Sequence, residues 1–108
     1  MSRALGDIAE EQACKYIQDL GFQIIERNYT LHGGEIDIIA IKDEILHFIE
    51  VKSGSSYHPL YNITPKKLQH VINTAHRFMQ RKNLDMLFVI DAISVQDGVC
   101  ELFENITV

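Results

Sequence analysis

Acidic side chains interrupt an otherwise apolar stretch of the chain, GGEIDIIAIKDEILHFIEVKS, at residues 33–53. The runs Ile36–Ile41 and Ile45–Val51 are rich in β-branched residues and too short for ordinary helices, so they predict two strands. A tight hairpin would place Asp37 opposite Glu50, with their Cβ atoms roughly 5 Å apart. Like charges at that separation raise one pKa or require a cation. Oxygen ligands of this kind suit Mg²⁺ or Mn²⁺.

The pairing also determines which side chains share a face of the sheet, because side chains alternate along a strand. A two-residue turn at 43–44 places Lys52 opposite Glu35, beside Asp37 and Glu50. The turn end of that face is apolar, with Ile39, Ile41, Leu46 and Phe48. The opposite face is nearly all apolar and holds Ile36, Ile38, Ala40, Ile49 and Val51. A hairpin that is apolar on both faces predicts a sheet covered on both sides.

The residues alone leave a second interpretation open. Asp37 and Glu50 would face solvent, and Lys52 would form an ordinary ion pair with a neighbouring acid. The turn sequence Asp-Glu is not the Asn-Gly or Asp-Gly that two-residue hairpins favour. A slip of one residue would move the two acids to opposite faces of the sheet.

The composition predicts a soluble globular protein with one domain, residues 1–108. Apolar residues make up 46% and charged residues 23%, which are ordinary proportions. The net charge of −5 argues against a protein that coats nucleic acid non-specifically, but allows a local basic rim around an acidic site. The two cysteines lack CxxC spacing and no apolar run approaches a membrane span, so we expect reduced thiols, a cytoplasmic location and no membrane.

Periodicity and turn residues predict the element order α-β-β-β-α-β-β. Helices are expected from Ser2 to about Leu20 and from Pro65 to about Lys82, and strands over 22–30, 36–41, 45–51, 86–94 and 99–108, the last at a sheet edge. Thr64-Pro65 is typical of a helix start, with threonine as N-cap and proline at the first helical position. The polar segment that follows Ser53 predicts a loop. The five histidines have no metal-ligand spacing and are expected at the surface.

Asp37, the run Glu50-Val51-Lys52 and Glu10 on the first helix form a constellation that resembles the PD-(D/E)XK nuclease superfamily, especially its Holliday-junction-resolvase-like branch. Nearer still, the chain resembles the small bacterial YraN-like family over almost its whole length. The matching segments are GDIAEEQACKYIQDLGFQIIERNY, GGEIDIIA, LHFIEVKS and ITPKKLQHVINTA. GEIDIIA and FIEVKS at this separation are the specific part of the resemblance.

The resemblance implies a single restriction-endonuclease-like domain, an α/β fold with a mixed sheet covered by helices on both faces. It also implies a nuclease that depends on Mg²⁺ or Mn²⁺ and cleaves DNA phosphodiester bonds, with branched or damaged structures as candidate substrates. Asp37 and Glu50 would hold the metal together with the Val51 carbonyl. Lys52 would position or help to deprotonate the attacking water, and Glu10 would reach the metal through water.

Basic side chains are the candidates for contact with the DNA backbone, namely Lys67, Lys66, Arg27, Arg3 and Arg77. The chain departs from the superfamily pattern at Ile36, where the nominal motif has proline, and at Leu68, where glutamine often follows the lysine. An alternative function is a non-catalytic module that keeps the nuclease fold and binds nucleic acid or a protein. Expected partners are nucleic acid, principally DNA, and a second copy of the chain as a homodimer.

Overall fold

The computed structural model describes residues 2–54 and 63–107 and has the predicted element order. Its elements are α1 (Ser2–Asp19), β1 (Gln23–Leu31), β2 (Gly34–Lys42), β3 (Ile45–Ser53), α2 (Pro65–Arg81), β4 (Phe88–Gln96) and β5 (Val99–Phe103). The helix start at Thr64-Pro65 is confirmed, because the Thr64 hydroxyl accepts the Lys67 N–H over 3.1 Å. The predicted loop lies outside the described residues except for its first residue, Gly54.

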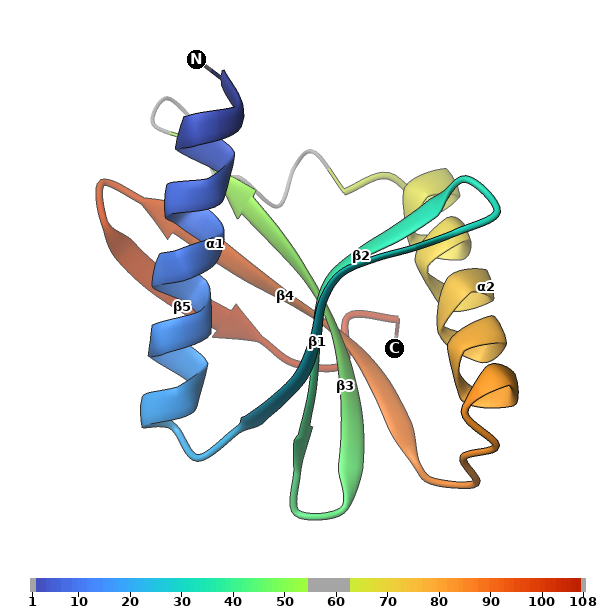
Figure 1. The fold of residues 1–108 in the computed structure, drawn as a ribbon. Coiled ribbons are helices and arrows are strands. Elements are labelled where there is room, and N and C mark those ends of the chain that lie inside the picture. The colour runs from blue at the N-terminus through green and yellow to red at the C-terminus, as the bar shows by residue number, and fades with distance from the viewer. Residues whose placement is uncertain (1, 55–62, 108) are drawn as a thin grey trace.

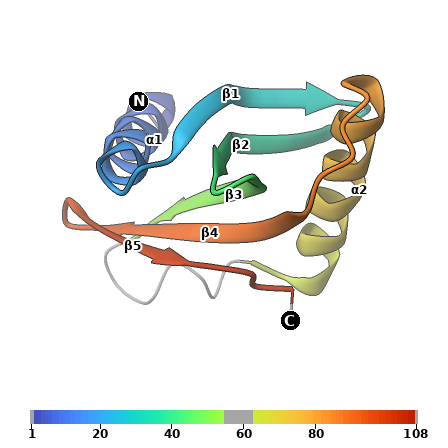
Figure 2. The ribbon, with the colours of Figure 1, turned by 90° about the horizontal axis from the view of Figure 1, so that it is seen from below.

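The five strands form one mixed sheet in the order β1-β2-β3-β4-β5, so β5 is an edge strand as predicted. Neighbouring strands are antiparallel except β3 and β4, which are parallel and joined through α2. The helices lie on opposite sides of the strands, α1 on the left and α2 on the right (Figure 1, Figure 2). Each helix covers its own apolar cluster, so the prediction of a sheet covered on both faces is confirmed. Neither helix, within the described part of the chain, is long and apolar enough to cross a membrane.

The hairpin between β2 and β3 turns at Asp43 and Glu44, as predicted. Both residues have positive φ, 51° and 65°. This is the type I′ geometry, whose twist matches that of the two strands, and here it forms without the usual glycine. Two consecutive residues with positive φ also form the turns of the other two hairpins, at His32-Gly33 and Asp97-Gly98.

The β2–β3 ladder confirms the predicted register near the turn. Its pairs are Ile38–Ile49, Ile39–Phe48, Ala40–His47, Ile41–Leu46 and Lys42–Ile45. Away from the turn, the pairing of β2 with β3 ends at Ile38–Ile49. The prediction that Asp37 pairs directly with Glu50, and Glu35 with Lys52, was therefore wrong. β2 leaves β3 at this point and follows β1 toward α2 (Figure 1).

Ile36 lies on the other face from the one predicted. It packs in the cluster under α2, whereas Ile38, two positions later, packs in the cluster under α1. Residues two apart share a face of a regular strand, so β2 must rotate about its axis at Asp37. The divergence of β2 from β3 explains this rotation, and it places Asp37 between the two faces of the sheet.

His47 is the exception to the expectation that histidines lie at the surface. His32, His70 and His76 are exposed and His58 lies outside the described residues, but His47 is buried. Its Nδ1 lies 2.5 Å from Asp91 Oδ2, and the other oxygen of Asp91 accepts the Asn105 N–H over 2.8 Å. β3 is covered on both faces, which explains why a polar residue at this position is buried. β5 ends at Phe103 and not at residue 108 as predicted, and beyond it Asn105 has a positive φ of 55° and donates its N–H to the Asp91 side chain.

Candidate functional site

A cavity of about 480 Å³ opens where β2 and β3 diverge, beside the first turns of α2. We call it the carboxylate cavity. Its lining includes Asp37, Glu50, Val51, Lys52, Lys66 and Lys67. The structure therefore brings together three of the predicted catalytic residues, the predicted carbonyl ligand and two of the predicted substrate-binding lysines.

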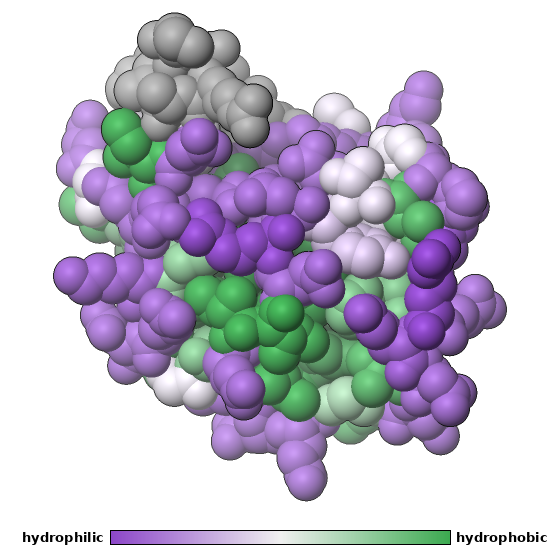
Figure 3. Space-filling view, viewed as in Figure 1, coloured by the Kyte–Doolittle hydropathy of each residue, from purple (hydrophilic) through white to green (hydrophobic). Residues whose placement is uncertain are grey.

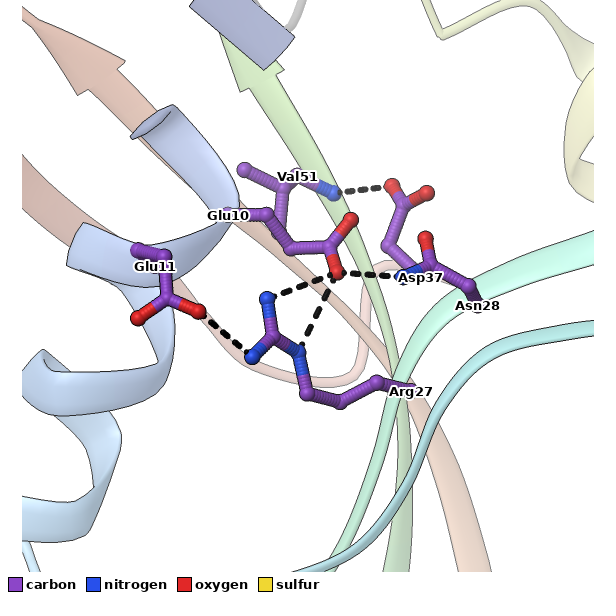
Figure 4. Close-up of polar contacts among 6 residues, drawn as sticks. All are labelled: Glu10, Glu11, Arg27, Asn28, Asp37 and Val51. Carbon is purple, nitrogen blue, oxygen red and sulfur yellow. Dashed lines mark hydrogen bonds and ion pairs between the residues drawn. The ribbon is translucent and has the colours of Figure 1, made fainter. Parts of the chain in front are cut away.

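Asp37 is held by the main chain of the next strand. The Val51 N–H donates to Asp37 Oδ2 over 2.8 Å (Figure 4). Since the ladder has ended at Ile38, this carboxylate takes the hydrogen bond that a strand carbonyl would otherwise accept. Burial raises the pKa of Asp37, the Val51 N–H opposes that rise, and the nearby Glu10 carboxylate adds to it.

Glu50 is buried, with 5% of its surface exposed. Burial raises its pKa from 4.5 to about 7, and the charge of Asp37 contributes to the rise. Lys52 and Lys67 act in the opposite direction but do not cancel it. The positive charges near Asp37 and Glu50 therefore do not offset the two carboxylate charges. A bound cation would stabilise the form in which both carboxylates are ionised.

Lys52, in the same cavity, shows the converse effect. Burial lowers the pKa of Lys52, and the neighbouring Lys67 lowers it further. One cavity thus presents two carboxylates that favour a cation and, beside them, two close ammonium groups that favour an anion. A metal ion together with a phosphate group would satisfy both requirements.

The donor set fits a hard divalent cation. Among the described residues, no three His, Cys, Asp or Glu side chains lie close enough together to hold a metal. Mg²⁺ does not need a third acid, because it commonly binds to one or two carboxylates and keeps water or substrate phosphate as its other ligands. Asp37, Glu50 and the Val51 carbonyl would provide a set of that kind.

Glu10 lies in a second cavity of about 500 Å³, which we call the α1 cavity. The two cavities share Glu35, Asp37 and Val51 in their linings, so they meet at Asp37. The Glu10 side chain is 10% exposed. Its Oε1 accepts hydrogen bonds from Arg27 Nε (3.3 Å), Arg27 Nη2 (3.1 Å) and Asn28 Nδ2 (2.9 Å) (Figure 4). With Oε1 used in this way, Oε2 is the atom left for other partners.

Arg27 does not join the lysines of the carboxylate cavity. The Arg27 guanidinium binds Glu10 and also Glu11, whose Oε1 lies 2.7 Å from Nη1. It lines neither the carboxylate cavity nor the α1 cavity. The backbone of Arg3 belongs to α1, but its side chain lies outside the described part of the structure.

Asn28 is a site residue that the sequence analysis missed. The β1–β2 pairs Arg27–Ile38 and Tyr29–Ile36 flank it, so it lies opposite Asp37. Its φ of 53° is in the left-handed region, which asparagine tolerates better than most residues. The signal was present in the sequence: a two-residue turn at His32-Gly33 sets the register that places Asn28 opposite Asp37.

Comparison with known proteins shows the family to which the chain belongs. Residues 9–95 match the uncharacterised protein family UPF0102. A UPF0102 protein of Helicobacter pylori (strain HPAG1) is 50% identical over 105 residues, which are 97% of this chain and 92% of that protein. A UPF0102 protein of Wolinella succinogenes is 49% identical over 107 residues, 99% of each chain, and one of Helicobacter hepaticus is 45% identical over 106 residues, 98% of this chain and 96% of that protein. The chain belongs to the UPF0102 family, which is the YraN-like family that its sequence resembles.

Proposed function

We propose that this protein is a metal-dependent nuclease that hydrolyses DNA phosphodiester bonds. One observation carries the proposal: the half-buried Asp37 and the buried Glu50 line a single cavity together with Lys52 and Lys67. Perturbed ionisable groups of both signs in one cleft are typical of sites that do chemistry. Phosphoryl transfer needs both signs, because the phosphate is anionic and its electrophilic activation needs a cation.

Asp37, Glu50 and the Val51 carbonyl would hold Mg²⁺ or Mn²⁺. The ion would supply Lewis-acid chemistry, lowering the pKa of water and offsetting charge on the phosphate. Lys52 has a lowered pKa, which brings its amine closer to the range in which it can accept and return a proton. We assign to Lys52 the role of positioning the attacking water. Lys66 and Lys67 would bind the phosphate backbone of the DNA.

Glu10 would act on the α1 side of Asp37, through water. Its Oε1 is occupied by Arg27 and Asn28, and this fixes the orientation of the carboxylate toward the α1 cavity. The match of Asp37, Glu50-Val51-Lys52 and Glu10 to the PD-(D/E)XK pattern supports the proposal. On that basis we also propose the restriction-endonuclease-like lineage, branched or damaged DNA as substrate, a homodimer as the assembly, and a cytoplasmic location, where the free Cys14 and Cys100 would stay reduced.

A non-catalytic module that binds nucleic acid or a protein on the same fold is the second candidate. It is favoured by one observation, namely that no third side-chain ligand joins Asp37 and Glu50 among the described residues. Under this function the carboxylate pair would be a remnant, and binding would not depend on a divalent ion.

A cleavage screen tests the two functions against each other. Purified protein would be incubated with single-stranded, duplex, flapped and four-way DNA in Mg²⁺, Mn²⁺ or chelator. Asp37→Asn is the inactivating variant. Asp43→Asn is its matched control, because Asp43 lies in the exposed type I′ turn, where asparagine is favoured.

The proposal predicts cleavage by the wild type and by Asp43→Asn in Mg²⁺ or Mn²⁺, and none by Asp37→Asn or in chelator. It fails if no DNA form is cut in either metal. It also fails if Asp37→Asn cuts as well as the wild type, since the activity would then belong to another site or to a contaminant.

A further inference from the structure

Positive charge is concentrated on α2. Residues 65–82 contain five of the ten Lys and Arg residues of the chain and none of its fifteen Asp and Glu residues. The segment therefore carries a formal charge of +5 and the rest of the chain −10, which together give the net charge of −5. The net charge of the whole chain argues against non-specific coating of nucleic acid. That total does not reveal that positive charge is separated from negative charge along the chain.

Three of these basic residues and one histidine form a stripe along one side of the helix. Lys66, His70, Arg77 and Arg81 follow one another at intervals of four, seven and four residues, so they lie on one side of an α-helix. All four are exposed, and the buried residues of α2, which include Val71 and Phe78, lie on another side. The right side of Figure 3, where α2 and the tip of the β1–β2 hairpin lie, is hydrophilic along its outer edge, with paler and apolar areas further in.

The beginning of this stripe violates a local rule of helix electrostatics. The first turn of a helix favours acidic residues, because the macrodipole is positive there. α2 has no acid in its first turn and carries Lys66 and Lys67 in it. Lys67 also lies next to Lys52, which lowers the pKa of Lys52. Residues that break a local rule of this kind are often found at functional surfaces.

The stripe is continuous with the carboxylate cavity. Lys66 and His70 line that cavity together with Asp37 and Glu50, and Arg77 and Arg81 extend the row away from it. At 1.5 Å per residue, the fifteen steps from Lys66 to Arg81 cover about 22 Å. A duplex rises about 3.4 Å per base step on each strand, so a helix of this length is long enough to contact several phosphates.

We propose that the α2 stripe binds the phosphate backbone of DNA and leads one strand into the carboxylate cavity. Nucleic acid is favoured over an acidic protein because the stripe has separated cations and no apolar side chain. Stable protein interfaces are instead centred on apolar or aromatic anchors. Delivery to the cavity rests on the proposed nuclease function, whereas backbone binding by the stripe does not.

The test is the salt dependence of DNA binding in chelator, where cleavage does not interfere. Fluorescence anisotropy with a labelled duplex of mixed sequence would be measured between low and moderate salt. The stripe variant is Arg77→Gln/Arg81→Gln. Its control is Lys15→Gln/Gln18→Glu, two exposed positions on α1. Both variants lower the formal net charge from −5 by two, to −7, so they change the overall field equally.

The stripe variant should weaken binding at least tenfold and reduce the slope of log K against log salt by about 2, because each lost phosphate contact contributes about 0.9. The control should change affinity less than threefold and leave the slope unchanged. Equal weakening by both variants, an unchanged slope, or no binding by the wild type at low salt would each overturn the proposal. So would displacement of the DNA by polyglutamate as effectively, charge for charge, as by unlabelled DNA.

This outcome is separable from that of the cleavage screen. Stripe-dependent binding without any metal-dependent cleavage would retain the surface and reject the nuclease. Cleavage that the stripe variant leaves unaltered in both KM and kcat would retain the nuclease and reject the stripe as its substrate track.

Discussion

The Val51 N–H donates to Asp37 Oδ2 over 2.8 Å at the point where β2 and β3 stop pairing. This single bond holds one carboxylate oxygen of Asp37, and the charge of the same carboxylate helps to raise the pKa of Glu50. The two cavities of the site meet at the same residue, because β2 turns away from β3 there. The divergence of two strands thus creates both the space and the orientation that a metal site needs.

Asp37→Asn should leave the stability of the metal-free protein unchanged or raise it. The change removes a charge that burial, Glu10 and Glu35 disfavour, and the amide oxygen can still accept the Val51 N–H. Thermal melts in chelator measure this. A fall of more than about 4 °C, roughly 1 kcal/mol for a domain of this size, would indicate instead that Asp37 forms a stabilising ion pair. Asp91→Asn is the control, and it should lose stability because Asp91 is buried with His47 and the Asn105 N–H as partners.

The metal-free protein should lose stability as the pH rises from about 4.5 to about 7. The pKa of Glu50 is raised in the folded state from 4.5 to about 7, so the folded protein binds more protons than the unfolded chain in this range. A pKa difference of this size corresponds to at most about 3 kcal/mol. Urea denaturation at pH 5 and pH 7.5 measures the change in the free energy of unfolding.

Glu50→Gln should remove most of that pH dependence, because glutamine does not titrate. Glu104→Gln, at an exposed position, is the control and should retain it. An equal pH dependence in the wild type and in Glu50→Gln would show that other groups cause it.

Lys52→Ala should reduce turnover by about 10²–10³-fold and leave metal binding largely intact. A positioned lysine stabilises charge in the transition state more than it holds the ion. Lys52→Arg should not restore full activity, because a guanidinium is larger and stays protonated. Glu50→Gln should instead abolish metal binding and turnover together. A loss of metal binding in Lys52→Ala equal to that in Glu50→Gln would contradict this division of roles.

Glu10 and Glu11 are adjacent and both bind Arg27, which makes them a matched pair. Glu10→Gln should reduce cleavage strongly, because Glu10 lies at the α1 cavity beside Asp37. Glu11→Gln should have little effect on cleavage, although its bond to Arg27 is the shorter at 2.7 Å. If Glu10 and Glu11 serve only to hold α1 against β1 through Arg27, both variants should instead lower Tm and activity to the same extent.

Asn28→Gly should reduce kcat while the protein remains folded. Glycine tolerates the positive φ of residue 28 but lacks the amide that donates to Glu10, so the carboxylate becomes free to rotate. Asn83→Gly is the control, because Asn83 is also exposed and has the same φ of 53°. An equal loss of kcat in both variants would assign the effect to the backbone and not to the Glu10 contact.

Much of the fold follows from local patterns in the sequence. Thr64-Pro65 marks the start of α2, and the alternation around the Asp43-Glu44 turn sets the register of the hairpin. The strand pairs that were predicted wrongly begin at Asp37. From this residue toward the start of β2, the strand stays paired with β1 but not with β3. That separation from β3 depends on the tertiary packing of Ile36 against α2, which no pattern within β2 or β3 reveals.

The candidate site shows the same division. Residue types and spacing identified Asp37, Glu50 and Lys52 as candidates, because charged side chains within an otherwise apolar hairpin are anomalous. The capture of Arg27 by Glu10 and Glu11 depends on how α1 lies across β1, and spacing along the chain does not determine it. Burial of His47 likewise depends on β3 being covered on both faces by helices that lie far away in sequence.

The most direct test of the central claim is a calorimetric titration with Mn²⁺ at pH 6 and pH 8, in buffers of different ionisation enthalpy. If Asp37 and Glu50 hold the ion, the wild type should bind Mn²⁺ and release protons. The release should be greater at pH 6, because the pKa of Glu50 is about 7 in the free protein and binding requires the ionised carboxylate. Asp37→Asn and Glu50→Gln should not bind, and Asp43→Asn should bind as the wild type does. Absence of Mn²⁺ binding by the wild type, or binding that survives both Asp37→Asn and Glu50→Gln, would contradict the account.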